Sequence, residues 1–121
     1  MASSISISAP NSLILISGGN GSVPNRFEEG KAVAATPTMI AVGTLSEFDG
    51  PTRITLVRGR AAIGELRELF DGNLQELKGK LVVQTCEGAV ILSGQFDYPQ
   101  ARIQVFSNDQ SEPDDIVIIY S

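Results

Sequence analysis

The sequence contains no histidine, no tryptophan and a single cysteine among its 121 residues. Histidine is the side chain that most often serves as a general base, as the base of a nucleophilic triad and as a ligand of transition metals. Its absence argues against all three kinds of site. Cys86 has no second cysteine to pair with, which argues against a secreted scaffold held by disulfides and favours a reducing cytoplasm. We therefore interpret Cys86 as a small, buried or half-buried apolar residue.

Long apolar runs are also missing. No stretch approaches the roughly 20 apolar residues of a membrane-spanning helix, and the start lacks the basic region and long apolar run of a signal peptide. We therefore expect a protein that neither enters a membrane nor is exported. The seven aromatic residues and the excess of acidic over basic side chains also argue against binding to nucleic acid.

The acidic excess is confined to the last third of the chain. Residues 1–80 hold eight acidic and eight basic side chains, so the net charge of −5 arises from residues 81–121. A surface with one sign of potential favours cationic partners. In this last third Arg102 is the single base, and we take its six carboxylates as the candidate partner-binding residues: Glu87, Asp97, Asp109, Glu112, Asp114 and Asp115.

Short apolar or alternating runs separated by turn residues are typical of an all-β protein. We predict a single domain over residues 1–121, folded as an antiparallel β-sandwich of about eight short strands. Residues 1–9 are rich in serine and either fray or begin an edge strand, because Ile5 and Ile7 alternate with polar residues. The eight predicted strands cover residues 12–17, 31–35, 38–44, 52–58, 80–86, 89–94, 101–107 and 115–120.

Three of these runs carry more detail. Glu87-Gly88 separates two apolar runs by two residues, which predicts a hairpin in which the glycine takes a positive φ. In residues 52–58 the apolar side chains alternate with Arg53 and Thr55, which predicts a half-exposed strand. Residues 116–120 are apolar on both faces, which favours a strand that is covered on both sides or lies in the middle of a sheet.

One segment departs from the pattern of alternation. In residues 61–70 the apolar side chains fall at helical spacing, and Gly72 follows as a candidate cap. We therefore predict one short helix over residues 61–70.

The order of features along the chain resembles that of the competence-nuclease inhibitor (ComJ) family and of similar small bacterial immunity proteins. The residues that carry the resemblance are Ile5 and Ile7 in an alternating start, Gly30 at the opening of a strand, and Phe96-Asp97-Tyr98-Pro99 before the alternating strand 102–106. A polar loop and a terminal strand follow. The resemblance implies an all-β protein that binds a nuclease and blocks it.

The first functional hypothesis is therefore a non-enzymatic inhibitor or immunity protein that neutralises a basic effector, such as a nuclease or toxin, through an acidic face. Nuclease active sites are basic because they receive phosphates, so an acidic surface can compete for the same groups. No cofactor motif is present, and pairing of exposed strands such as 52–58 between subunits leaves a homodimer open.

Two alternatives remain. One is a small-molecule or carbohydrate-binding β domain, with calcium as an aid, because the segment 108–115 is dense in oxygen ligands although it lacks the EF-hand spacing. The other is an enzyme that uses two carboxylates, which would need at least one buried acid with a raised pKa. No acid lies in an apolar run, so this second alternative is the less favoured.

Overall fold

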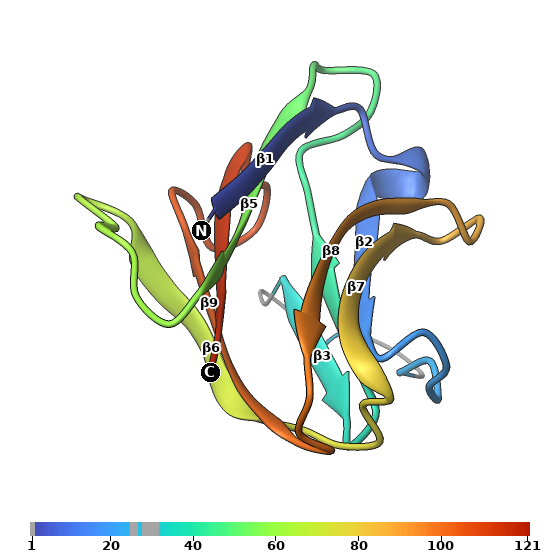
Figure 1. The fold of residues 1–121 in the computed structure, drawn as a ribbon. Helices are drawn as coiled ribbons and strands as arrows, with labels where there is room; N and C mark the ends of the chain where they lie inside the picture. The colour runs from blue at the N-terminus through green and yellow to red at the C-terminus, as the bar shows by residue number, and fades with distance from the viewer. Residues whose placement is uncertain (1, 25–26, 28–31) are drawn as a thin grey trace.

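Two five-stranded sheets pack face to face around an apolar core (Figure 1). The structure is a computed structural model that describes residues 2–24, 27 and 32–121. The first sheet contains, in spatial order, β1 (Ala2–Ile7), β5 (Thr52–Arg58), β10 (Asp115–Tyr120), β9 (Ala101–Ser107) and β6 (Arg67–Leu74). The second sheet contains β3 (Val33–Thr36), β4 (Met39–Gly43), β2 (Leu13–Ser17), β7 (Gly79–Thr85) and β8 (Val90–Phe96).

The mainly β sandwich predicted from the sequence is confirmed. Each of the eight predicted strands corresponds to a strand of the structure, and the described residues add β1 and β6. Neighbouring strands are antiparallel except β5 and β10, which run parallel. Gly30 and Lys31, which the sequence placed at the opening of the second strand, lie outside the described residues.

The alternation of side chains explains how each strand contributes to the core. In β5, Ile54 and Leu56 point between the sheets and are buried, whereas Arg53 is exposed on the other face. In β10 both faces are buried: Ile116 and Ile118 belong to the core between the sheets, and its alternate residues belong to a second apolar cluster outside. The prediction of a central strand for residues 116–120 is confirmed, because β10 lies between β5 and β9.

The predicted hairpin at Glu87-Gly88 is also confirmed. β7 and β8 are antiparallel neighbours, and Gly88 adopts a φ of 90° in the turn between them. The N–H of Gly88 donates to the carbonyl oxygen of Thr85 at 3.0 Å, which closes the turn. A side chain at this φ would be strained, so the glycine is required by the turn geometry.

The helix predicted for residues 61–70 is wrong. Residues 67–74 form strand β6, which pairs with β9, and the only helical segment of the described residues is the three-residue 3₁₀ turn Pro10–Ser12. Gly72, predicted as a helix cap, lies inside β6.

Two local features produce the misleading spacing. A tight turn brings the N–H of Leu66 to the carbonyl oxygen of Ile63 at 3.0 Å, and both side chains then pack on the outer face of the first sheet. In β6 a register shift between Glu68 and Phe70 inserts Leu69 as an extra residue, so two apolar residues follow each other. A turn followed by a bulge therefore imitates the period of a helix.

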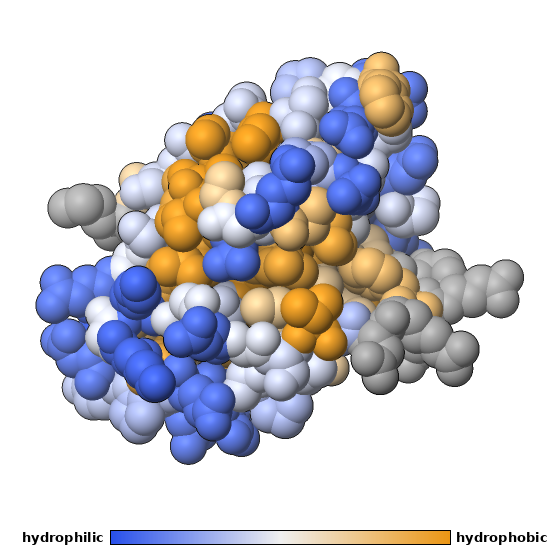
Figure 2. All heavy atoms as spheres, turned by 90° about the vertical axis from the view of Figure 1, so that its right-hand side faces the viewer, coloured by the Kyte–Doolittle hydropathy of each residue, from blue (hydrophilic) through white to orange (hydrophobic). Residues whose placement is uncertain are grey.

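The outer face of the second sheet is apolar as well. Leu15, Met39 and Ala41 form a buried cluster there with partly buried Leu13, and Figure 2 shows apolar side chains gathered across the middle of this side of the molecule. Because β2 and β4 present apolar residues on both faces, their sequences read as continuous apolar runs. In the described part of the chain, no helix has the length and apolar character needed to cross a membrane.

Candidate functional site

Five of the six candidate carboxylates lie at one end of the sandwich. β10 begins with Asp115 and its antiparallel partner β9 ends with Ser107, so the loop 108–114 that joins them lies at that end. In the second sheet, β7 ends at the same end and Glu87 follows it. The N–H of Leu45, just after β4, donates to the carbonyl oxygen of Pro113 at 2.8 Å and connects the two sheets there. The loops 44–51, 86–89 and 108–115 together are named the acidic end.

Asp97 does not belong to this group. It follows β8, and the register of β8 with β7 pairs Phe96 with Gly79, the first residue of β7. Because β7 runs from this end of the molecule towards the acidic end, Asp97 lies at the opposite end of the sandwich. The sequence therefore grouped six carboxylates of which the fold brings five together.

The fold also adds carboxylates that the sequence analysis did not select. Glu47 and Asp49 lie in the loop between β4 and β5, next to the 108–114 loop. Phe48 stands between them with 91% of its side chain exposed. A large apolar residue between two acids in a turn-rich segment could have indicated this part of the surface. The charge count did not identify it, because residues 1–80 are neutral overall.

Asp109 shapes the loop in which it lies. One of its carboxylate oxygens, Oδ1, accepts hydrogen bonds from the N–H of Ser111 at 2.8 Å and from the N–H of Glu112 at 3.2 Å. The hydroxyl of Ser111 donates to the same oxygen at 3.2 Å. These bonds favour the charged form and hold the pKa of Asp109 below its usual range, with the backbone bond from Ser111 the largest cause.

Asn108 braces the loop from the other side. Its side-chain oxygen accepts hydrogen bonds from the N–H groups of Asp114 and Asp115, each at 3.2 Å, and its side-chain N–H donates to the carboxylate of Asp114. The carboxylates of Asp109 and Asp114 therefore stabilise the conformation of the loop. Both side chains are exposed, as are Glu112 in the same loop and Glu87 in the loop 86–89, so a partner can reach all four.

A recess of about 290 Å³ lies between the loops of the acidic end. Hydroxyl side chains of Ser46 and Thr44 form one side of it, and Ser111 and Glu112 form another. The lining also includes the apolar residues Phe27 and Ala32. This mixture of apolar, hydroxyl and carboxylate groups suits a lysine or arginine side chain, which has an apolar stem and a charged tip.

Arg102, the single base of the last third, is neutralised by an acid from another part of the chain. Its Nη2 and Nε atoms donate to the two carboxylate oxygens of Asp71 at 2.7 and 2.9 Å. The hydrogen bond from Arg102 lowers the pKa of Asp71. This two-point pair joins β6 to β9. Because the positive charge of Arg102 is balanced by Asp71, it does not offset the negative charge of the acidic end.

The acidic end offers no metal centre of the usual kind. Across residues 2–24, 27 and 32–121, no group of three or more His, Cys, Asp or Glu side chains is placed to hold a metal ion. The side-chain oxygens of Asn108 and Asp109 and the carboxylate of Asp114 are engaged in hydrogen bonds within the loop. The calcium-assisted alternative finds no support in this arrangement.

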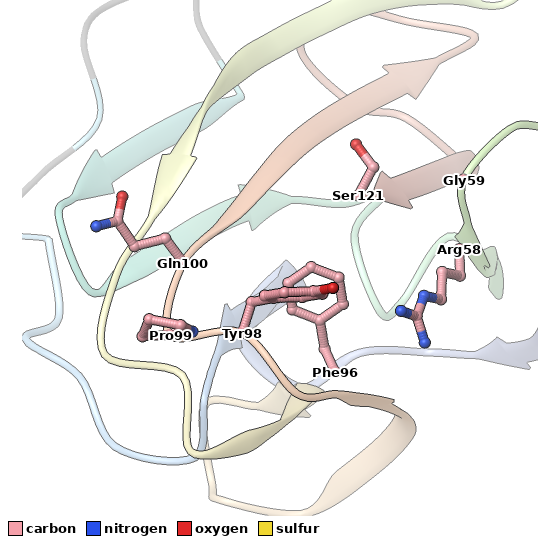
Figure 3. Close-up of a pocket in the computed structure, with 7 residues that line it drawn as sticks. All are labelled: Arg58, Gly59, Phe96, Tyr98, Pro99, Gln100 and Ser121. Carbon is pink, nitrogen blue, oxygen red and sulfur yellow. The ribbon is translucent and has the colours of Figure 1, made fainter.

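A second recess lies at the opposite end, where Phe96 and Tyr98 approach each other with ring centroids 5.4 Å apart (Figure 3). Arg58, from the first sheet, places its guanidinium carbon 5.1 Å from the centroid of the Phe96 ring. These residues come from the end of β5, the end of β8 and the link after β8, which only the packing of the two sheets brings together, so the sequence did not identify them as a site.

Fold and surface together define a class: a two-sheet β-sandwich whose loops gather negative charge at one end. No protein-family model matches the sequence, and a search of curated proteins finds no match. A search of solved structures finds the same fold in the crystal structure of ComJ from Bacillus subtilis, an inhibitor of the DNA-degrading activity of NucA. The two share 12% sequence identity with a TM-score of 0.59, over 99% of this chain and 93% of ComJ. The resemblance that the sequence suggested is therefore confirmed at the level of the fold.

Proposed function

We propose that this protein is a non-enzymatic inhibitor, of the immunity-protein kind, that binds a basic effector such as a nuclease with its acidic end. The observation that carries the proposal is the convergence of charged loops from both sheets at one end of a fold shared with a nuclease inhibitor.

The composition of the acidic end supports contact with a protein. Phe48 supplies an exposed aromatic side chain between Glu47 and Asp49, and interfaces are commonly anchored by such side chains. Exposed Glu112 lies beside the recess between the loops, which suits a basic side chain of the partner. Opposite potentials on the two surfaces accelerate their encounter, which helps an inhibitor capture a harmful enzyme early.

The test is a DNA-degradation assay with purified protein. We expect the protein to suppress, at roughly equal molar amounts, a nuclease from a panel that includes NucA and any nuclease encoded beside its own gene. Phe48→Ala is expected to weaken the inhibition by about tenfold or more, since removal of an interface anchor typically costs ~2 kcal/mol. Tyr98→Ala is the matched control, because Tyr98 is also an exposed aromatic residue but follows β8 at the opposite end of the sandwich. Full nuclease activity throughout the panel would contradict the proposal.

The alternative of a small-molecule or carbohydrate-binding domain has one specific observation in its favour, the recess beside Phe96 and Tyr98. It lies at the opposite end from the proposed partner surface, so the two functions do not exclude each other.

A further inference from the structure

The recess at the opposite end has the size of a small-molecule site. Its volume is about 530 Å³, within the range of roughly 300 to 1,000 Å³ that is typical of ligand pockets. It opens between the end of β5 in the first sheet and the link that follows β8 in the second (Figure 3). The lining residues are Arg58, Gly59, Phe96, Tyr98, Pro99, Gln100 and Ser121.

The floor of the pocket is held in place before any ligand binds. The Phe96 side chain is only 4% exposed, and its ring meets that of Tyr120 edge to face at 5.7 Å and 79°. Tyr120 in turn fills the space above Gly94, where a Cβ atom would overlap the tyrosine hydroxyl. Because these contacts cross between the sheets, the ring of Phe96 has little freedom to move.

Tyr98 forms an open wall above this floor. Its side chain is 63% exposed, and its ring is tilted by 59° to that of Phe96. An exposed aromatic ring beside a buried one offers a flat ring of a ligand a surface on which to stack. The pocket therefore favours a ligand with a planar apolar part.

Arg58 sets the charge of the ligand. Its side chain is the only charged side chain in the lining, and among the described residues no Asp or Glu carboxylate lies within salt-bridge distance of it. The face of its guanidinium group lies over Phe96, so its N–H groups remain available at the edge. Two parallel N–H donors match the two oxygens of a carboxylate.

We propose that this pocket binds a small aromatic carboxylate. The ring of the ligand stacks against the exposed ring of Tyr98, which Phe96 supports from below, and its carboxylate accepts hydrogen bonds from the guanidinium group of Arg58. Gly59, Pro99, Gln100 and Ser121 complete the lining. This site is independent of the acidic end, which lies at the other end of the molecule.

The test is an NMR titration of the ¹⁵N-labelled protein with benzoate as the probe. We expect saturable shifts at the amides of Gly59 and Gln100, with a Kd of about 1 mM as befits so small a ligand. Fluorescence offers a second readout, since Tyr98 and Tyr120 are the only tyrosines and tryptophan is absent. Benzyl alcohol, which keeps the ring, and acetate, which keeps the charge, are each expected to bind about tenfold more weakly.

Variants separate this site from general anion binding. Arg58→Gln is expected to weaken benzoate binding by about tenfold, and Arg58→Lys by a smaller factor because the charge remains without the planar fork. Arg60→Gln removes a nearby exposed charge outside the lining and is expected to bind benzoate as the unchanged protein does. Arg58→Gln should also retain full nuclease inhibition, so failure of this proposal can be distinguished from failure of the inhibitor proposal.

Two results would overturn the assignment. One is a set of benzoate shifts spread over the surface instead of centred on residues 58–59 and 96–100. The other is equal affinity of the Arg58→Gln and Arg60→Gln variants, each shown by its thermal unfolding curve to be folded.

Discussion

At the scale of single residues, the acidic end divides its carboxylates between two tasks. All four are exposed, but Asp109 and Asp114 accept hydrogen bonds that shape the loop 108–115, whereas Glu87 and Glu112 make no side-chain hydrogen bond among the described residues. A charge count along the sequence treats the four alike, because it contains no information about which carboxylate accepts backbone N–H groups. The distinction predicts which substitutions alter stability and which alter binding.

Asp109 should make stability depend on pH. Its pKa is lowered in the folded state, so its contribution is fully present above the pKa of the unfolded chain and is lost as the pH falls through the folded value. We expect Asp109→Asn to lower the urea midpoint at pH 7, with the difference from the unchanged protein shrinking as the pH falls below about 4.

Glu112→Gln is the control for this experiment, because it removes a carboxylate from the same loop without removing an acceptor of backbone bonds. Its urea midpoint is expected to equal that of the unchanged protein both at pH 7 and at pH 2. A difference between Asp109→Asn and the unchanged protein that persists at pH 2 would contradict the role given to the charge.

At the scale of elements, the strands that alternate or are wholly apolar could be predicted from the sequence. Residues 52–58, 101–107 and 115–120 form strands over the predicted ranges. β6 could not be predicted in this way, because its inserted Leu69 breaks the alternation and the preceding turn at Ile63 and Leu66 adds apolar residues at helical spacing. A helix and a strand would both use these apolar side chains, and what favours the strand is its pairing with β9, which is distant in the sequence.

The segment before β6 has a covering role that can be tested. Ala61, Ile63 and Leu66 pack against Val57, Phe106, Val117 and Ile119 on the outer face of the first sheet. We expect Leu66→Ser to lower the free energy of unfolding by about 1 kcal/mol, since Leu66 is only partly buried. It should also increase the binding of a dye that reports exposed apolar surface.

The neighbouring Ala62→Ser is the matched control, because the Ala62 side chain is exposed. It should change neither the unfolding curve nor the dye signal. If Leu66→Ser unfolded like the unchanged protein, the proposed packing of this segment on the sheet would be wrong.

At the scale of the whole molecule, the asymmetry of charge in space differs from the asymmetry along the chain. Residues 1–80 are neutral overall, yet Glu47 and Asp49 join the acidic end. Asp97, from the acidic last third, lies at the opposite end. The sequence therefore predicted the sign of the candidate surface and most of its residues, but the position of each charge depended on strand order.

This polarity predicts how the effector approaches. The double variant Glu87→Gln/Glu112→Gln removes two charges from the acidic end, and Glu76→Gln/Asp97→Asn removes two from the opposite end. We expect only the first to slow association with the inhibited nuclease, by about threefold to tenfold at low salt and much less at 0.5 M salt. Stopped-flow measurement of the association rate compares the two variants at equal net charge. Equal rates for both would show that the acidic end does not steer the encounter.

The parallel pairing of β5 with β10 has a consequence for the order in which the molecule can be made. β10 is the strand that joins the β1–β5 pair to the β9–β6 pair, so the first sheet stays in two halves until residues 115–120 have been synthesised. Pairing of segments about 60 residues apart is slow compared with local hairpins. A newly made copy therefore gains its complete first sheet only after the ribosome has finished the strand that also fixes Asp115 in place.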